Sequence, residues 1–373
     1  MDVIFTIIIY ITLFGIMFSL CSIAKAYNKW EYTLIAILIY SIVFGMRYGV
    51  GVDFYGYLDA YKSALIGNST RDFEIGFQFI IKVLTYIGLH SIFFFGFISF
   101  LQLYLIFKSI KTDIHIYKYL VFTFMMGCVW LGYANTIRQV LAFCIFVYSL
   151  TYIEKGKPFL HYLCILLATS VHTSAIGLIV IYPLLYWKKE WFNNINIQIA
   201  LFICAWFLGQ SSELLGIKYI SEILSNNGLF ENNYSIYISD EYQSYMHNSV
   251  KLGIGYLTIL LTDIILVTTS NKYKQALKNN LLTYMYNLYF IGILLRYTFI
   301  SSMMVGRIND YFYGFKYIIA SYALYYLYSH NNKKLFYLLA SMYIMTFIAN
   351  MVNMFENTAV FRFFWEKQYL LNI

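Results

Sequence analysis

Long apolar stretches, separated by short segments that contain lysine, alternate along almost the whole chain. A membrane-spanning helix needs roughly 20 apolar residues, and somewhat fewer where flanking aromatic and lysine side chains reach the interface. The pattern therefore predicts an all-α, polytopic integral membrane protein of about twelve transmembrane helices. The predicted spans are 3–24, 31–46, 91–108, 119–133, 138–153, 158–171, 174–187, 195–209, 251–269, 281–301, 311–328 and 335–352.

Two segments between the predicted spans are expected to lie on the outer side. The first, 47–90, contains the apolar but short run 77–89, whose Lys82 and Gly88 favour a helix that lies in the interface or re-enters the membrane. The second, 210–250, is polar, aromatic and mildly acidic, and it could cover a bound glycan or have no such role. No Gly- or Ser-rich linker divides the chain, so we expect a single multi-span domain over 1–373.

Composition agrees with this class, because 61% of the 373 residues are hydrophobic and only 12% are charged. The first apolar run follows a Met-Asp start and leads to KAYNKW, so we expect a first span rather than a cleaved signal peptide. We expect no nucleic-acid partner, no metal and no nucleotide cofactor, since no Gly-rich phosphate loop or D-x-D pair occurs in the outer segments. The cysteines have neither metal-ligand nor disulfide spacing: Cys21, Cys128, Cys144, Cys164 and Cys204.

Basic residues divide by type between the two predicted sides of the membrane. Short cytoplasmic loops collect Lys and Arg, and an outer amino terminus makes every inner loop basic. The basic residues of these inner loops are all lysines: Lys25, Lys29, Lys108, Lys111, Lys118, Lys155, Lys157, Lys188, Lys189, Lys272, Lys274, Lys278, Lys333 and Lys334. The arginines all fall in outer loops or outer halves of spans: Arg47, Arg71, Arg138, Arg296, Arg307 and Arg362. Because only the planar guanidinium binds phosphate or carboxylate in a bidentate way, the outer face is expected to hold an anion site.

Other unusual polar residues fall on the same predicted side. Ionisable groups near the bilayer are costly and usually face a cavity or a partner. We therefore expect these side chains to converge on one pocket: Asp53, Glu74, Arg138, Gln139, His172 and Arg307.

Structural interpretations remain open for several of these positions. Arg47 could anchor a span at the lipid headgroups, and Asp53 could belong to an ordinary turn. Glu74 could cap a helix or pair with Arg71. His172 could be a packed histidine bonded to backbone carbonyls.

The remaining arginines differ in how readily a structural role explains them. Arg138 and Arg307 stand beside apolar spans with no acid at helical spacing apart from Asp310, which favours a functional role. Arg296 lies deeper in its predicted span, where it could line the cavity or pair with backbone or a glutamate.

Five short elements follow one another in a fixed order along the chain: RYGVGVDFYGY, FEIGFQFI, TIRQVLAF, VHTSA and GRINDYF. In their order and common predicted side they resemble the bacterial EpsG-like family and related Wzy-type polysaccharide polymerases. The resemblance extends from Arg47 to about Phe312. Val52 departs from it, because the family pattern has a small or hydroxyl residue there, and this weakens the assignment of Asp53.

The resemblance implies a GT-C-like glycosyltransferase that joins oligosaccharide repeat units carried on undecaprenyl pyrophosphate. Such an enzyme works at the outer face of the bacterial cytoplasmic membrane on O-antigen, capsule or exopolysaccharide units, with a chain-length regulator protein as partner. The repeat unit itself cannot be carried over.

This chemistry requires cations for the pyrophosphate and a base for the acceptor hydroxyl. Arg138 and Arg307, followed by Arg47, are the predicted pyrophosphate ligands. The candidates for the general base are, in order, His172, Glu74 and Asp53. Further side chains expected to line the cavity are Arg296, Gln139, Tyr55, Tyr57 and Tyr311.

Three other classes of membrane protein are compatible with parts of this pattern. A flippase or other transporter should show two related halves, and the chain has no convincing internal repeat. A membrane O-acyltransferase could use His172, but its acyl donor usually comes from the cytoplasm. An O-antigen ligase would share fold and chemistry and differ only in its acceptor.

Overall fold

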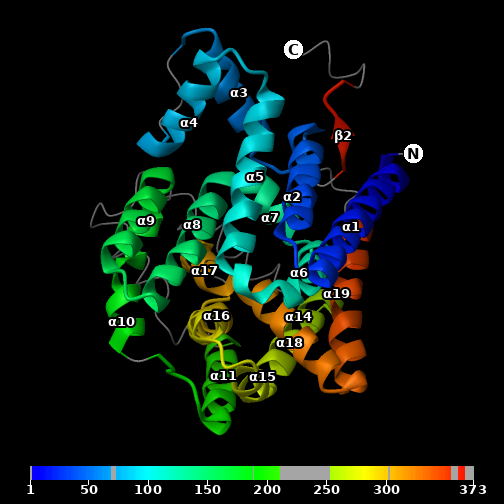
Figure 1. Ribbon diagram of the computed structural model, residues 1–373, viewed down its shortest axis with the longest axis vertical. Helices are drawn as coiled ribbons and strands as arrows, with labels where there is room; N and C mark the ends of the chain where they lie inside the picture. The colour runs from blue at the N-terminus through cyan, green and yellow to red at the C-terminus, as the bar shows by residue number, and fades with distance from the viewer. Residues whose placement is uncertain are drawn as a thin grey trace. The chain divides into compact units, whose positions relative to one another are not determined.

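The computed structural model describes residues 2–68, 73–187, 189–210, 253–300, 303–353 and 360–365, and these residues are almost entirely helical (Figure 1). The described chain divides into two compact units, one formed by Met1–Trp187 with Ala320–Ile373 and the other by Lys188–Ile319. The expectation of one domain over 1–373 stays a prediction. The predicted outer loop 210–250 lies outside the described residues from position 211 onward, as does Arg71.

The first unit contains most of the helices. Its α-helices are α1 (Asp2–Tyr27), α2 (Trp30–Gly45), α3 (Phe54–Leu65), α4 (Ile75–Tyr86), α5 (Ser91–Ser109), α6 (Tyr117–Met126), α7 (Val129–Asn135), α8 (Ile137–Glu154), α9 (Pro158–Val171), α10 (Ile181–Trp187) and α19 (Lys333–Asn353). Two 3₁₀ segments, η1 (Lys111–Ile116) and η2 (Thr173–Val180), precede α6 and α10. The second unit contains α11 (Ile195–Gln210), α14 (Ile254–Thr268), α15 (Ser270–Leu277), α16 (Asn280–Thr298) and α17 (Met303–Tyr313), and α18 (Lys316–Ser329) begins in it.

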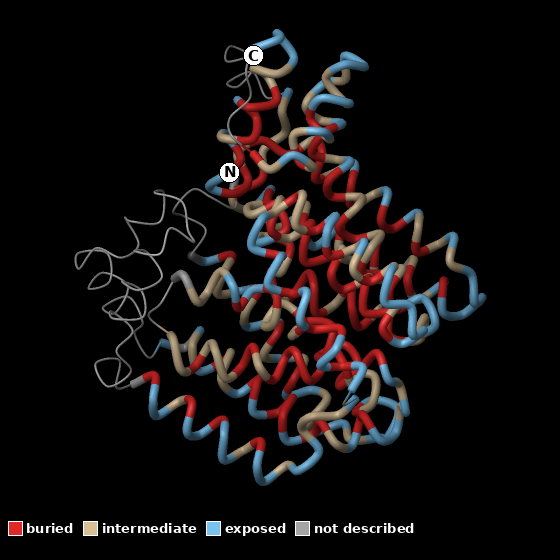
Figure 2. The backbone as a smooth tube through the Cα atoms, turned by 90° about the vertical axis from the view of Figure 1, so that its left-hand side faces the viewer, coloured by how far each residue is buried: buried red, intermediate tan, exposed pale blue. Residues whose placement is uncertain are grey.

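Several helices have the length and composition of membrane spans. Among the described residues, α1, α5, α8 and α19 are long and apolar enough to cross a bilayer, and a bent pair, 111–126 with 129–135, would add a fifth span. Shorter apolar helices occupy other predicted spans, including α2, α9, α11 and α14. Exposed positions on α1 are apolar, as at Ile4, Ile8 and Ile11, and exposed positions recur along the helices in Figure 2. An apolar exposed face is typical of a helix in lipid. The count of twelve spans stays a prediction.

Some predicted spans are interrupted in ways that the apolar pattern does not indicate. The span 119–133 bends by 69° where Cys128 adopts a left-handed φ of 52°. The segment 174–187 begins as a 3₁₀ helix, and the segment 311–328 is divided between α17 and α18. The outer segment after Arg47 contains a helix, α3, that the sequence did not indicate.

An aromatic core joins α3, α4 and α5. The rings of Phe54 and Phe95 stack at 4.8 Å, and those of Tyr61 and Phe94 stack at 4.9 Å. Phe77, from the predicted interfacial run, is fully buried in the same cluster. These contacts fix the position of α4, so Glu74 at its amino-terminal end is held by a packed framework.

The carboxyl-terminal segment returns to the start of the RYGVGVDFYGY element. Strand β2 (Arg362–Phe363) pairs antiparallel with β1 (Arg47–Tyr48), with Arg47 opposite Phe363. Next to this pair, the N–H of Phe364 donates to the carbonyl of Met46 at 3.2 Å. The described carboxyl-terminal residues 360–365 therefore lie beside this element (Figure 1).

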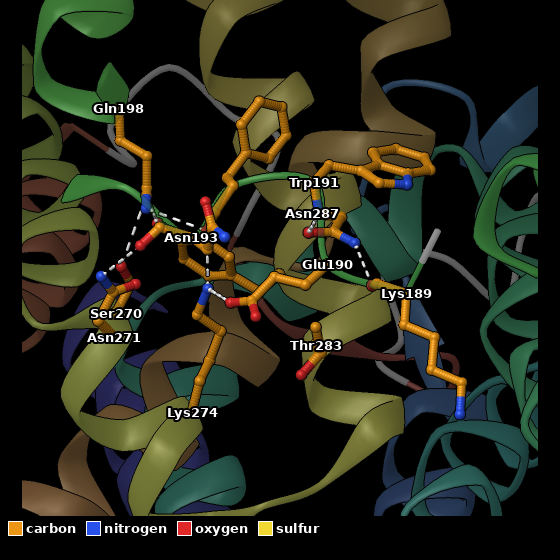
Figure 3. A network of polar contacts seen from close by, with 12 residues as sticks. Lys189, Glu190, Trp191, Asn193, Gln198, Ser270, Asn271, Lys274, Thr283 and Asn287 are labelled. Carbon is orange, nitrogen blue, oxygen red and sulfur yellow. Dashed lines mark hydrogen bonds and ion pairs between the residues drawn. The ribbon is translucent and has the colours of Figure 1, made fainter. Parts of the chain in front are cut away.

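In the second unit, a polar network holds the segment before α11 against α15 and α16 (Figure 3). The ammonium of Lys274 lies 2.7 Å from Glu190 Oε1 and 2.9 Å from the carbonyl of Phe192. The amide of Asn287 donates to the carbonyl of Lys189 at 2.8 Å and accepts from the N–H of Trp191 at 3.3 Å. Lys274, predicted as an ordinary inner-loop lysine, is thus a buried ion-pair partner.

Candidate active site

Three helix ends supply the side chains that meet in the first unit. Glu74 is the residue before α4, in an extended conformation, and its carboxylate does not cap its own helix. His172 directly follows α9, where extended backbone interrupts the helix before η2. Arg138 lies in the first turn of α8. At helix ends some backbone groups have no partner within the helix, and side chains there are less confined by helix packing. Helix ends are therefore suitable places for a site.

Glu74 is the centre of the cluster. Its Oε1 lies 2.9 Å from Nδ1 of His172 and accepts from the N–H and hydroxyl of Thr173 at 3.2 and 3.3 Å. Its Oε2 accepts from Nη1 of Arg138. The side chains of Glu74, His172 and Arg138 are 17%, 14% and 25% exposed, so the cluster is mostly buried but reaches solvent.

Gly76 permits this approach. Helices α4 and α9 pack together, and a Cβ on Gly76 would stand 2.3 Å from Oγ and 2.8 Å from the carbonyl oxygen of Ser170. No side chain fits at that distance, so glycine allows the start of α4 to contact the end of α9. This contact places Glu74, two residues earlier, beside His172, two residues after Ser170.

The charges around Glu74 keep its carboxylate ionised. Burial alone would raise the pKa of Glu74, but the hydrogen bond from His172, the positive charge of Arg138 and the donors from backbone together lower it to about 2. A carboxylate with several donors and so low a pKa is a weak base at neutral pH. It is well suited to orient the groups that it contacts.

Arg138 is held by aromatic and acidic neighbours. Its guanidinium carbon lies 4.6 Å from the centre of the Phe73 ring, and its Nε is buried without a hydrogen-bond partner among the described residues. Tyr57, one of the predicted cavity residues, is buried next to it: burial raises the pKa of Tyr57, and the charge of Arg138 opposes that rise.

The RYGVGVDFYGY element lies beside the same helix ends. Gly51 has a φ of +97°, and a Cβ there would stand 3.0 Å from Cα of Asn135. The N–H of Asp53 donates to Oδ1 of Asn135 at 3.0 Å, while the side chains of Asp53 and Tyr55 are exposed. Glycine at position 51 therefore allows the backbone of this element to approach the end of α7 closely.

Arg47, the third predicted pyrophosphate ligand, is directed into the protein. Its side chain is 2% exposed, and its guanidinium donates to the carbonyls of Phe44 at 2.6 Å and Ala134 at 3.2 Å. The Phe95 ring lies 4.8 Å from the guanidinium carbon. Burial lowers the pKa of Arg47 to about 10, so it remains charged at neutral pH. These contacts favour a structural role that joins α2 to α7.

The other predicted residues occupy different environments. Gln139 is buried in α8, with 5% exposure. Arg296, Arg307 and Tyr311 belong to the second unit, where Arg307 is half-buried within α17 and Tyr311 is buried in the same helix. The GRINDYF element therefore forms a helix in place of the expected outer loop.

The sequence reasoning overlooked Asp263 and Lys316. Asp263 is fully buried in α14, and its Oδ1 lies 2.8 Å from Nζ of Lys316. A single acid within the apolar run LTILLTDIILV was the available signal, since an ionisable residue inside a span suggests a functional partner.

In the described part of the chain, no group of three His, Cys, Asp or Glu side chains is placed to hold a metal ion.

A family model described as EpsG family matches residues 30–365, from the start of α2 to the residues after β2. The chain belongs to the EpsG family. No curated protein and no solved structure matches it. The match confirms the resemblance inferred from the five sequence elements, all of which it includes. Membership of the EpsG family, which is Wzy-like, indicates a polysaccharide polymerase.

Proposed function

We propose that this EpsG family member joins undecaprenyl-pyrophosphate-linked repeat units at the outer face of the bacterial cytoplasmic membrane, within a GT-C-like multi-span fold. Family membership supports a polymerase. The single observation that adds a mechanism is the contact between His172 Nδ1 and Glu74 Oε1. In this proposal the enzyme works with a chain-length regulator protein as its partner.

The contact with Glu74 determines which nitrogen of His172 acts as the base. An ionised carboxylate only accepts hydrogen bonds, so Nδ1 of His172 carries the proton that faces Glu74. In the neutral ring, Nε2 then has the free lone pair. Among the described residues no hydrogen-bond partner of Nε2 is found, and the side chain is partly exposed.

The proposed reaction uses this lone pair. Nε2 of His172 takes the proton of the acceptor hydroxyl as its oxygen bonds to the anomeric carbon of the donor sugar. The bond from that carbon to the pyrophosphate oxygen breaks, and undecaprenyl pyrophosphate leaves. Glu74 stabilises the imidazolium that forms, and Arg138 uses donors not engaged by Glu74 to stabilise the negative charge of the leaving group.

This assignment orders the candidate bases. Glu74 positions His172 and does not accept the proton itself, because its pKa is about 2. Asp53 is exposed, and its backbone N–H is the group bonded to Asn135. His172 is therefore the proposed base.

The test is polymerisation by the purified protein with a defined lipid-linked repeat unit. A ladder of chain lengths is expected, whereas a ligase or a flippase produces none without its own partner. His172→Gln should reduce turnover by roughly 10²–10⁴-fold while the donor still binds. Wild-type protein that binds the donor but makes no ladder would falsify the polymerase assignment, and near-normal turnover of His172→Gln would exclude His172 as the base.

A further inference from the structure

A fully buried carboxylate in the second unit collects four donors. Oδ1 of Asp263 accepts from the hydroxyl of Tyr289 at 2.6 Å and lies 2.8 Å from Nζ of Lys316. Oδ2 accepts from the hydroxyls of Tyr297 and Tyr313, both at 2.8 Å. Helices α14, α16 and α17 and the start of α18 all contribute to this cluster.

Stability alone does not account for such a cluster. Removing two charges from water costs several kcal/mol per ion, and apolar residues of similar volume often stabilise a fold as well or better. A buried pair surrounded by hydroxyl donors instead defines one geometry, because each donor has a fixed direction. The cluster therefore suits a part of the protein in which one side chain must be held accurately.

Tyr313 connects the cluster to an arginine. Its hydroxyl is fixed twice, as donor to Asp263 and as acceptor from Nζ of Lys316 at 2.9 Å. The guanidinium carbon of Arg296 lies 4.7 Å from the centre of the Tyr313 ring, within the range of a cation–π contact.

Close helix packing supports this arrangement. A Cβ on Gly292 would stand 2.4 Å from the backbone nitrogen of Tyr313, so glycine lets α16 approach the end of α17. Arg296 follows Gly292 by four residues and projects from the same face of α16. The ring of Tyr313 is thereby brought to the arginine.

The guanidinium of Arg296 keeps its donors available. Within the part of the chain that the structure describes, no hydrogen bond or ion pair joins it to an acceptor; its contact with Tyr313 is through the ring. An arginine that stacks on an aromatic ring presents its N–H groups at the edge, in the geometry that binds phosphate oxygens in a bidentate way.

The geometry points to Asp263 and Tyr313 as positioning residues that hold Arg296 for binding the diphosphate group of a lipid-linked substrate. This inference rests on the proposed function for the identity of the anion. It assigns roles to Asp263, Lys316 and Tyr313, which act on the ligand through Arg296.

Binding of undecaprenyl diphosphate to the purified full-length protein in detergent tests the inference directly. Arg296→Lys keeps the charge but loses the fork, and it should weaken binding by about 10-fold or more. Tyr313→Phe keeps the ring and loses the anchor, and a smaller loss, of at least about 3-fold, is expected. Asp263→Asn would leave Lys316 unpaired and could prevent folding, so Tyr313→Phe is the main variant. Inorganic diphosphate should compete with the lipid if the headgroup is what Arg296 recognises.

Tyr286→Phe is the matched control. Tyr286 is a buried tyrosine of α16 whose hydroxyl donates to Gln198, outside the Asp263 cluster. Its removal should leave the dissociation constant unchanged. A double-mutant cycle gives the decisive reading, since Tyr313→Phe should have no further effect once Arg296 is replaced by Gln.

Each outcome has one meaning. Unchanged binding by Tyr313→Phe, an equal loss in Tyr286→Phe, or additive losses in the cycle would overturn the inference, as would absence of binding by the wild type. Wild-type protein that binds undecaprenyl diphosphate with the expected variant pattern but forms no polymer ladder would leave this inference standing and reject the proposed reaction. A normal polymer ladder from the wild type, together with unchanged binding by Tyr313→Phe, would leave the proposed reaction standing and reject this inference.

Discussion

Nδ1 of His172 lies 2.9 Å from Oε1 of Glu74, although 98 residues separate them along the chain. The ionised Glu74 fixes the proton of His172 on Nδ1, and the ring presents Nε2 as the basic atom. Arg138 on the opposite carboxylate oxygen helps to keep Glu74 ionised, and in the proposed reaction it stabilises the negative charge of the leaving group.

Glu74→Gln should lower turnover by roughly 10²–10⁴-fold with donor affinity retained, because the amide cannot stabilise the imidazolium and can present an N–H to Nδ1. The measurement is kcat for polymerisation of a defined lipid-linked repeat, together with donor binding. Asp53→Asn, at an exposed position close to the same helix ends, is the matched control and should retain most activity. If Glu74→Gln polymerises normally, Glu74 only joins α4 to α9.

Acid stability gives a second test of the ionised Glu74. Its pKa falls from 4.5 to about 2 on folding, so the folded protein binds fewer protons than the unfolded protein between these values. The stabilisation is complete above about pH 4.5 and is lost as pH falls toward about 2. Thermal unfolding in detergent should therefore show a smaller loss of stability between pH 5 and 3 for Glu74→Gln than for wild type. Identical slopes for the two proteins would contradict the contacts described for Glu74.

The positions of many helices could be predicted from apolar pattern alone. The runs at 3–24, 91–108 and 138–153 correspond to α1, α5 and α8 with ends displaced by at most a few residues. Hydrophobicity reports which segments avoid water, but it does not report where a helix bends. The break at Cys128 depends on a left-handed φ, and cysteine is not a residue type that predicts this conformation.

The grouping of the candidate site residues was predictable in part and for a specific reason. Glu74, Arg138 and His172 stand out because they are ionisable residues at the ends of apolar runs, and the structure brings these three together. The same rule selected Arg47, yet a guanidinium can satisfy backbone carbonyls as well as phosphate, and only the fold shows which it contacts. Asp263 lies in the middle of an apolar run, so a rule based on the ends of such runs does not select it.

Gly76→Ala should separate α4 from α9 and impair activity without removing the protein from the membrane. The added methyl group would overlap Ser170, and such overpacking costs about 1–3 kcal/mol. The shift would also lengthen the contact between Glu74 and His172, so kcat should fall more than donor affinity. Gly15→Ala in α1, where no atom lies within 4 Å of the added group, is the control and should behave as wild type. Equal activity of both variants would show that the contact between α4 and α9 tolerates the added methyl group.

Arg47 and Arg138 should respond differently to replacement by lysine. Lysine cannot reach two backbone carbonyls as a planar fork does, and each lost partner in a buried site costs about 1–3 kcal/mol. Arg47→Lys should therefore lower the unfolding temperature and the yield of folded protein. Arg138→Lys retains the charge beside Glu74 at a partly exposed position, so the protein should fold normally and lose polymerisation. Comparing detergent-solubilised yield and thermal unfolding with the polymer ladder separates the two. A well-folded but inactive Arg47→Lys variant would support the predicted role of Arg47 as a pyrophosphate ligand.

Fusions to a phosphatase that is active only outside the cytoplasm test whether the candidate residues share one side of the membrane. The lysine-rich segments predict the inner side, because positive charge in short loops is retained in the cytoplasm. Fusions after Asp53 and His172 should be active, and fusions after Lys111, Lys157 and Lys274 should be silent. The fusions after Asp53 and Lys111 are the most informative, because these residues flank the run 77–89. With Asp53 outside, a full span at 77–89 would move Lys111 from the inner to the outer side. An active fusion at Lys111 together with an active fusion at Asp53 would require a span between 77 and 89 in addition to α5. Silence at both Asp53 and His172 would place Glu74, Arg138 and His172 on the cytoplasmic side, where the proposed substrate is not delivered.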